Sequence, residues 1–269
     1  MTSDVESTRQ LERRLFEFYE KALVALTEAE IPFLVGGAYA LAHYTGVVRH
    51  TKDLDLFVLP GDYEHVLRVL AEAGYHTEVT APHWIAKAFY GEDFIDVIFS
   101  SGNGVAAVDE GWFAHAVEAK VLGRRVKVCP PEETIWSKAY VMERERYDGA
   151  DIAHLLRACS EQMDWPRLLR RFGAHWRVLL SHLILFGFIY PDARRQVPHW
   201  VMQQLLAQLQ GELGGLPPQE RICQGTLLSR AQYLIDIENW GYEDGRLLPR
   251  GPLTPAETAH LTASVDRGK

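Results

Sequence analysis

Two aspartates separated by one residue stand in the run from Lys52 to Val58, which alternates polar and apolar side chains. Alternation with a period of two predicts a β-strand, so Asp53 and Asp55 should share one face, with their Cα atoms about 6.6 Å apart. Two carboxylates on one face repel each other unless a cation lies between them, and aspartate is uncommon in strands. The pair therefore indicates a metal site, although an ordinary exposed strand face would show the same pattern.

A third carboxylate, Asp96, interrupts an otherwise apolar run from Phe94 to Phe99. A partly buried carboxylate needs a cation or hydrogen bonds, because burial otherwise drives it to take up a proton. Asp96 could also mark nothing more than a strand end. Three carboxylates on adjacent strands would suit two Mg²⁺ ions, which prefer oxygen ligands. We therefore predict a catalytic and metal-binding site made of Asp53, Asp55 and Asp96.

A glycine pair, Gly36 and Gly37, follows the apolar run that ends at Val35 and precedes a helical pattern that begins at Ala38. Glycines at a strand-to-helix turn let a phosphate approach backbone N–H groups, and the dipole of the helix favours the negative charge. A lone glycine pair is more often only a tight turn. Together with three strand carboxylates, it predicts a site for phosphoryl or nucleotidyl transfer.

Basic residues supply further candidates. Three of them, expected to contact nucleotide phosphates, are Arg49, Lys52 and Lys138. Four others, which lie among aromatic residues and could hold a tRNA or another nucleic acid, are Arg167, Arg170, Arg171 and Arg177. All of these cations could instead be ordinary solvated charges on exposed faces.

The pattern of elements around these residues predicts an α/β (α+β) fold in two parts. Residues 1–130 alternate short strands with helices and should form a small mixed β-sheet with flanking helices. Residues 131–269 should form a helical domain, with a loosely packed tail from about Gly241. The strands expected later in the first part are 76–79, 85–89, 94–99 and 126–129. The helices expected in the second part are 132–146, 148–160, 164–173, 175–189, 198–211 and 219–239.

Composition excludes several classes of protein. With 47% hydrophobic and 24% charged residues, the 269-residue chain can bury a core and is not a disordered protein. The net charge of −8 argues against a generally basic nucleic-acid-binding surface. Three scattered cysteines make neither a disulfide framework nor a zinc site, and no P-loop, dinucleotide-binding or nucleophile-elbow motif occurs. The longest apolar stretch, 178–190, is too short to cross a bilayer, so we expect a soluble cytoplasmic protein without membrane contact.

In these motifs the chain resembles the nucleotidyltransferase superfamily that includes DNA polymerase beta. The matching segments are Val35-Gly36-Gly37, Asp53-Leu54-Asp55 and Ile95-Asp96-Val97. Residues 36–55 look most like the bacterial branch that contains abortive-infection-type toxins and antibiotic-modifying enzymes. In that branch the core is often followed by helices with a lysine and a short acidic motif, and Lys138 and 148–152 are similar to these. Many members have serine where Gly37 stands, so this chain can offer only a backbone amide there.

The resemblance implies transfer of a nucleoside monophosphate from a magnesium-bound triphosphate, with ATP among the candidate donors, to a hydroxyl acceptor. The acceptor could be a nucleic acid such as tRNA, a small molecule or a protein. Asp53 and Asp55 would hold two Mg²⁺ ions, the glycine pair would contact the outgoing phosphates, and Asp96 would complete the second metal site and help to deprotonate the acceptor. Two other functions stay open: a catalytically degenerate module that binds a partner such as an antitoxin, and a nucleic-acid-binding protein.

Overall fold

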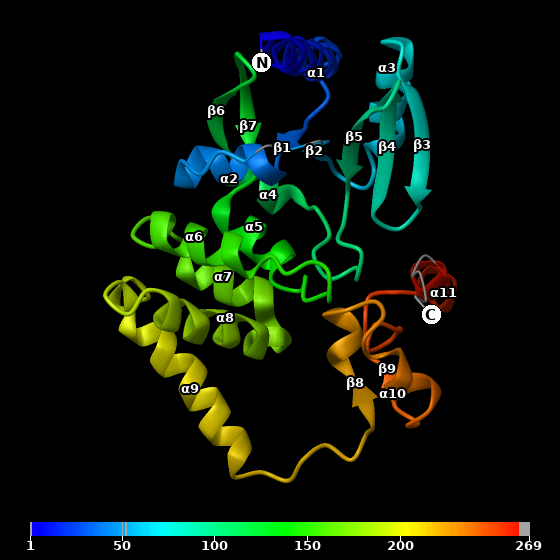
Figure 1. The fold of residues 1–269 in the computed structure, drawn as a ribbon. Coiled ribbons are helices and arrows are strands. Elements are labelled where there is room, and N and C mark those ends of the chain that lie inside the picture. The colour runs from blue at the N-terminus through cyan, green and yellow to red at the C-terminus, as the bar shows by residue number, and fades with distance from the viewer. Residues whose placement is uncertain (1, 50, 52, 264–269) are drawn as a thin grey trace. The chain divides into compact units, whose positions relative to one another are not determined.

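The chain folds into two compact units. The structure is a computed structural model that describes residues 2–49, 51 and 53–263, and among them the side chains from residue 14 onward. One unit consists of Met1–Ser101 and Ala107–Pro130, and the other of Gly102–Ala106 and Pro131–Lys269 (Figure 1). The first unit is built on a mixed β-sheet and the second is mainly helical. The predicted α/β (α+β) fold, a mixed sheet with flanking helices followed by helices, is confirmed.

The sheet of the first unit has, among the described residues, seven strands in the order β3-β4-β5-β2-β1-β7-β6. The strands are β1 Leu34–Val35, β2 Asp53–Phe57, β3 His76–Ala81, β4 Ile85–Tyr90, β5 Asp93–Ile98, β6 Val117–Val121 and β7 Arg124–Val128. β2 pairs in parallel with β5, and β1 pairs in parallel with β7. The remaining neighbours are antiparallel. Of these strands, β6 is not predicted by the sequence, because two of its five residues are charged and three are exposed.

Helices of the first unit are α1 Thr2–Glu28, α2 Gly37–Thr45, α3 Tyr63–Glu72 and α4 Glu110–Ala114. α1 contacts α3 and β5, and α3 contacts β3 and β4 (Figure 1). Their apolar residues form one core with the sheet, in which Leu23 and Leu26 of α1 and Leu54 and Leu56 of β2 are completely or almost completely buried. Because strand side chains alternate between faces, Asp55, which lies between Leu54 and Leu56 on β2, points away from this core.

The second unit contains helices α5 Pro131–Lys138, α6 Gly149–Cys159, α7 Trp165–Phe172, α8 Trp176–Ile189, α9 His199–Leu213, α10 Leu234–Glu238 and α11 Pro255–Ala263. It also contains the 3₁₀ turns Gly173–His175, Arg194–Gln196 and Gln224–Leu227 and a two-stranded parallel sheet of β8 Ile222–Cys223 and β9 Glu243–Asp244. α5 contacts α6 and α7, and α8 contacts α6, α7 and α9. The predictions for α6, α7, α8 and α9 are correct to within about two residues.

Two long helices predicted in the second unit are wrong. Instead of a helix over 132–146, α5 ends at Lys138, and a turn closed by the bridge between Met142 and Tyr147 follows. Instead of a helix over 219–239, the chain forms β8, a 3₁₀ turn and the short α10. Tertiary pairing replaces the helical hydrogen bonds at both places: the Met142 N–H donates to the Leu228 carbonyl at 3.1 Å, and β8 pairs with β9.

The tail from Gly241, expected to be loosely packed, contains a buried ion pair. Asp244 and Arg246 form an ion pair at 2.6 Å whose side chains are 5% and 1% exposed. Leu253 and Leu261 are buried as well, and α11 closes the described part of the tail. The glycines and prolines there form tight turns around this ion pair; a Cβ on Gly251 would meet the Arg246 backbone at 2.2 Å.

A helical stretch of the second unit, Trp165–Ile189, is long and apolar enough to cross a membrane when judged by length and composition alone. Its most apolar window has a mean hydropathy of 1.4, and 39% of that window is buried inside the protein. Leu179, Leu183 and Phe186 of α8 belong to the buried residues, whereas Phe188 is 81% exposed. The stretch therefore packs partly as a core helix, and core helices of soluble proteins pass the same length and composition test.

Candidate active site

Three carboxylates meet on the face of the sheet that is turned away from the α1–α3 core. β2 and β5 pair in parallel, and their register places Asp55 directly beside Asp96. Asp53 stands two residues before Asp55 and so shares its face. One oxygen from each of the three side chains lies within 4.8 Å of the other two, and all three residues are half-buried. Hard divalent cations such as Mg²⁺ take oxygen ligands, so the residues present fit such an ion.

Two neighbouring side chains fix the orientation of these carboxylates. The Thr51 hydroxyl donates a hydrogen bond to Asp53 Oδ1 at 2.5 Å. Lys87 Nζ lies 2.5 Å from Asp96 Oδ1, and the register of β4 and β5 pairs the two residues directly. Sequence reasoning did not select Thr51 or Lys87. A lysine inside the apolar strand 85–90 was a visible signal, but its partner depends on how the strands pair.

The glycine turn lies directly against Asp55. The Gly36 N–H donates to the Asp55 carbonyl at 2.9 Å, and α2 begins at the next residue. A Cβ on Gly36 would lie 2.3 Å from the Phe57 ring. Gly37 has a φ of +53°, and a Cβ there would lie 1.7 Å from Asp55 Oδ2. A side chain at position 37 would therefore displace Asp55, and the positive φ also favours glycine there.

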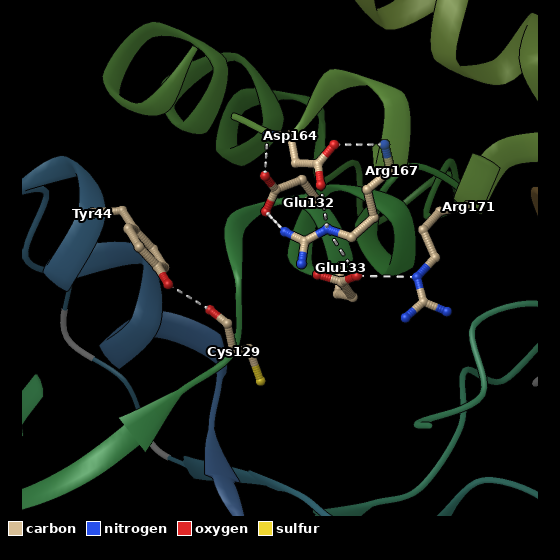
Figure 2. A network of polar contacts seen from close by, with 7 residues as sticks. All are labelled: Tyr44, Cys129, Glu132, Glu133, Asp164, Arg167 and Arg171. Atoms are coloured by element: carbon tan, nitrogen blue, oxygen red, sulfur yellow. Dashed lines mark hydrogen bonds and ion pairs between the residues drawn. The ribbon is translucent and has the colours of Figure 1, made fainter. Parts of the chain in front are cut away.

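The helix that follows the glycines is anchored at its other end. Tyr44 near the end of α2 donates a hydrogen bond from its hydroxyl to the Cys129 carbonyl at 3.0 Å (Figure 2). Cys129 directly follows β7, whose neighbour in the sheet is β1. The contact thus holds α2, and with it the backbone N–H groups of the glycine turn, in a fixed place relative to β2.

The negative charge of the aspartates acts on two nearby phenols. Burial raises the pKa of Tyr19, and the charges of Asp53 and Asp55 add to that effect. Burial and the charge of Asp53 also raise the pKa of Tyr39. Both phenols therefore stay neutral at physiological pH, and neither can act there as a base.

The three predicted phosphate-binding cations fall into different environments. Arg49 is exposed and lines a pocket of about 270 Å³ together with Tyr39 and Thr51. Lys52 lies outside the described residues. Lys138 belongs to the second unit, where its Nζ lies 2.7 Å from Asp148 and 2.9 Å from Asp151.

Within the second unit, Lys138 and the acidic motif that follows it form one cluster. Burial raises the pKa of the Asp148 carboxyl, but the hydrogen bond from Arg146 and the charge of Lys138 outweigh burial and hold the pKa below its usual range. A Cβ on Gly149 would lie 2.1 Å from the Tyr147 ring, so the tyrosine ring packs directly on this glycine between the two aspartates of the motif. The structure therefore brings together the lysine and the acidic motif that the sequence places ten residues apart.

The prediction that Arg167 and Arg171 bind nucleic acid is wrong. Arg167 forms ion pairs with Glu132, Glu133 and Asp164 (Figure 2). Arg171 lies 3.0 Å from Glu133 Oε1, and the two arginine side chains are only 10% and 16% exposed. Burial raises the pKa of Glu133, although both arginines act in the opposite direction. These arginines neutralise buried glutamates and are not available to phosphates.

The other two arginines of that segment are exposed. Arg177 pairs with Glu212 and lies over the Trp176 ring, with its guanidinium 4.4 Å from the ring centroid. Arg170 is exposed on α7. With two of the four arginines buried in ion pairs, the segment is not the continuous basic surface that its composition indicated.

Comparison with known families identifies the chain. The model of a family described as "Uncharacterised nucleotidyltransferase" matches residues 1–184, which include the whole sheet, the glycine turn and the three aspartates. The chain belongs to this nucleotidyltransferase family. By that membership it is a transferase, and the predicted relation to the nucleotidyltransferase superfamily is confirmed. None of the curated proteins matches it.

Several solved structures are similar to the chain. The antibiotic-resistance factor ANT(2'')-Ia is 20% identical, with a TM-score of 0.45 over 62% of this chain and 95% of its own. The lincosamide antibiotic adenylyltransferase LnuA is 18% identical, with a TM-score of 0.38 over 52% and 94%. JHP933 from Helicobacter pylori is 14% identical, with a TM-score of 0.38 over 74% and 97%.

Proposed function

We propose that this nucleotidyltransferase moves a nucleoside monophosphate from a metal-bound triphosphate to a hydroxyl group, and that Asp53, Asp55 and Asp96 form its catalytic site. The observation that carries the proposal is the convergence of three carboxylate oxygens within 4.8 Å, beside a turn that allows no side chain at Gly37. Carboxylate oxygens beside the N-terminal end of a helix, whose first N–H groups have no partner within the helix, are what a metal-bound phosphate chain requires.

Each residue has a role in the proposed reaction. Asp53 and Asp55 would hold divalent metal. The Thr51 hydroxyl orients the Asp53 carboxylate, and the Gly36 N–H holds the Asp55 backbone carbonyl. Bound magnesium supplies positive charge that stabilises the negative charge developing on the phosphates. The backbone N–H groups at the start of α2 would contact the β- and γ-phosphates, where the helix dipole favours negative charge.

The proposed transfer is a displacement at the α-phosphorus of the triphosphate. The acceptor oxygen forms a bond to that phosphorus, and the bond from phosphorus to the α–β bridging oxygen breaks, so pyrophosphate leaves with the electron pair. The hydroxyl proton would pass to the Asp96 carboxylate. Because Lys87 holds Asp96 Oδ1, the carboxylate is fixed before substrate arrives.

The arginine segment does not favour a nucleic acid over a small molecule or a protein as the acceptor, because Arg167 and Arg171 are buried in ion pairs. Lys138 remains a proposed phosphate contact, in which case a triphosphate would compete with Asp148 and Asp151 for its ammonium group. Exposed Arg49 and also Lys52 remain proposed phosphate contacts of the first unit. We keep a cytoplasmic location as an expectation.

The proposal is tested by following radioactive label from each of four α-³²P nucleoside triphosphates, with magnesium, to total tRNA, aminoglycosides, lincosamides and a protein extract. The wild type should transfer label and release pyrophosphate, and Asp55→Asn should do neither. Glu118→Gln, which changes an exposed strand carboxylate on β6, is the matched control and should behave as the wild type. Equal transfer by Asp55→Asn, or no transfer from any donor to any acceptor class, would contradict the proposal.

A further inference from the structure

The hairpin of β6 and β7 carries positive charge on one of its faces (Figure 1). Its antiparallel register places Lys120 opposite Arg125 and Glu118 opposite Lys127. Residues opposite each other on paired strands project from the same face, so all four side chains share one face. The three cations are exposed, and Glu118 lies 3.8 Å from Arg125, whose side chain is 84% exposed. Lys120, Arg125 and Lys127 are called the basic hairpin face below.

The basic hairpin face lies on the same side of the sheet as the three aspartates. Val128 on β7 pairs with Val35 on β1, Val35 pairs with Leu56 on β2, and all three are buried in the core. Lys127 and Asp55 each stand one residue before a member of this row, so both project from the opposite face. Only β1 lies between β2 and β7, which places the two strands roughly 10 Å apart at the usual strand spacing.

Protection of a sheet edge does not account for these cations by itself. β6 is an edge strand, and edge strands often carry charge that prevents pairing with another chain. Charge of either sign serves that purpose, and β7, which carries two of the three cations, is not at the edge. The neighbouring Arg124 projects from the other face, where it pairs with Glu20 of α1 at 2.9 Å. On a chain with a net charge of −8, three exposed cations on one face indicate an anionic partner.

We propose that the basic hairpin face binds the phosphate backbone of a nucleic acid whose terminal hydroxyl is the acceptor. The inference rests on the proposed function and names the class of acceptor for the site of Asp53, Asp55 and Asp96. Lysine and arginine along one face of a β-ribbon suit the repeated phosphates of a polynucleotide, which they attract whatever its base sequence. A strand that runs from β7 across the sheet towards β2 would bring its end to the aspartates. The terminal ribose hydroxyl would then be the attacking group of the transfer described above.

The first test measures binding of a fluorescein-labelled RNA of about 20 nucleotides, and of DNA with the same sequence, by fluorescence anisotropy without metal or triphosphate. The wild type should bind one or both, more weakly as salt rises from about 50 to about 200 mM. Three phosphate contacts, at about 0.7 each, should contribute about 2 to the slope of log Kd against log salt. A variant without the three cations should lose this contribution and bind at least about 10-fold more weakly at the lower salt concentration. That variant is Lys120→Gln/Arg125→Gln/Lys127→Gln.

The matched control removes three exposed cations elsewhere and changes the net charge by the same amount. It should bind the RNA and the DNA as the wild type does, because local phosphate contacts and not the total charge hold the strand. The control is Arg68→Gln/Arg194→Gln/Arg195→Gln.

The second test follows α-³²P label from the triphosphate to the bound nucleic acid. With the acceptor below saturation, the hairpin variant should transfer label at least about 10-fold more slowly than the wild type, in line with its weaker binding. Its rate at saturating acceptor and its magnesium-dependent thermal shift with triphosphate should equal those of the wild type, because the aspartates are unchanged.

Failure of the inference can be told apart from failure of the proposed function. The inference alone is overturned if the wild type binds neither RNA nor DNA, if the hairpin variant binds as tightly as the wild type, or if the control variant loses as much affinity. Label that passes only to small molecules or proteins would overturn it as well. No transfer from any triphosphate to any class of acceptor would contradict the proposed function, and the inference with it, even if the hairpin binds nucleic acid.

Discussion

Two clusters of charged side chains in this protein differ in how far they are buried. The glutamates of α5, Glu132 and Glu133, are 3% and 0% exposed and face two arginines of α7, which neutralise them (Figure 2). The aspartates of β2 and β5 are half-buried, their oxygens converge, and Lys87 forms an ion pair with one of them, Asp96. A buried, balanced cluster is completed by its own residues, whereas converging half-buried carboxylates can bind a cation as a ligand. The first cluster therefore supports the fold, and we propose that the second performs the chemistry.

The largest expected effect falls on the aspartate cluster that we propose to be catalytic. Asp96→Asn should slow nucleotidyl transfer by about 10⁴-fold, or about 5.4 kcal/mol, because no carboxylate then takes the proton from the substrate hydroxyl. Triphosphate binding should persist, since Asp53 and Asp55 remain. Single-turnover rates measured beside thermal shifts with triphosphate check this division. Loss of binding together with loss of transfer would assign Asp96 to metal binding and not to proton transfer.

The next largest effect falls on the balanced cluster. Arg167→Met should lower the free energy of unfolding by about 3–5 kcal/mol, because it leaves buried glutamates without their main counter-charge. Urea denaturation measures the change. Arg170→Met, on the exposed side of the same helix, is the control and should stay within about 0.5 kcal/mol of the wild type. Equal stabilities of the two variants would show that the Glu–Arg contacts contribute little.

A smaller effect is expected at the glycine turn. Gly37→Ala should destabilise the protein by about 1–3 kcal/mol, because its φ is +53°. It should also abolish the magnesium-dependent thermal shift, because the new Cβ would displace Asp55. Gly91→Ala has a similar φ of +66° and nothing within 4 Å of its Cβ, so it should lose stability and keep the shift. A shift retained in Gly37→Ala would separate the glycine turn from the metal site.

The smallest effect concerns a buried histidine of the second unit. Burial lowers the pKa of His182 below its usual value, although its hydrogen bond to the Ala139 carbonyl acts in the opposite direction. The unfolded chain therefore takes up a proton at a higher pH than the folded protein does, and stability should fall as pH drops below about 6.5. His182→Gln should reduce the difference in unfolding free energy between pH 7 and pH 5. The exposed control His199→Gln should leave that difference unchanged.

The sequence indicated the aspartate cluster, which we propose to be catalytic, but not the Glu–Arg cluster, and the reason is physical. Asp53 and Asp55 stand out because period-two alternation is a local signal, and Asp96 lies in an apolar run of its own. Arg171 and Glu133 are 38 residues apart and meet only once α5 and α7 have packed together. The arginines therefore looked like a nucleic-acid surface when only their neighbours in sequence were considered.

The same reasoning explains which elements were missed. Lys87 was passed over because its partner depends on the register of β4 and β5. The helix predicted over 219–239 gave way to β8 because its backbone groups find partners in β9, and no local pattern reports such a pairing. Helices with their own amphipathic period, such as α7 and α8, were predicted correctly. Features set by neighbouring residues could be predicted from the sequence, whereas contacts between residues far apart in the chain could not.

The central claim is that the three aspartates bind a divalent cation together with a nucleoside triphosphate. Thermal stability of the wild type and of Asp53→Asn, with each of the four nucleoside triphosphates in the presence and absence of magnesium, tests it without knowledge of the acceptor. With magnesium and its preferred triphosphate at about 100 times the dissociation constant, the wild type should gain roughly 5–10 °C. Asp53→Asn should gain nothing, and without metal it should be at least as stable as the wild type, because one repelling charge is gone. An equal gain in both proteins, or no gain with any triphosphate, would contradict the claim.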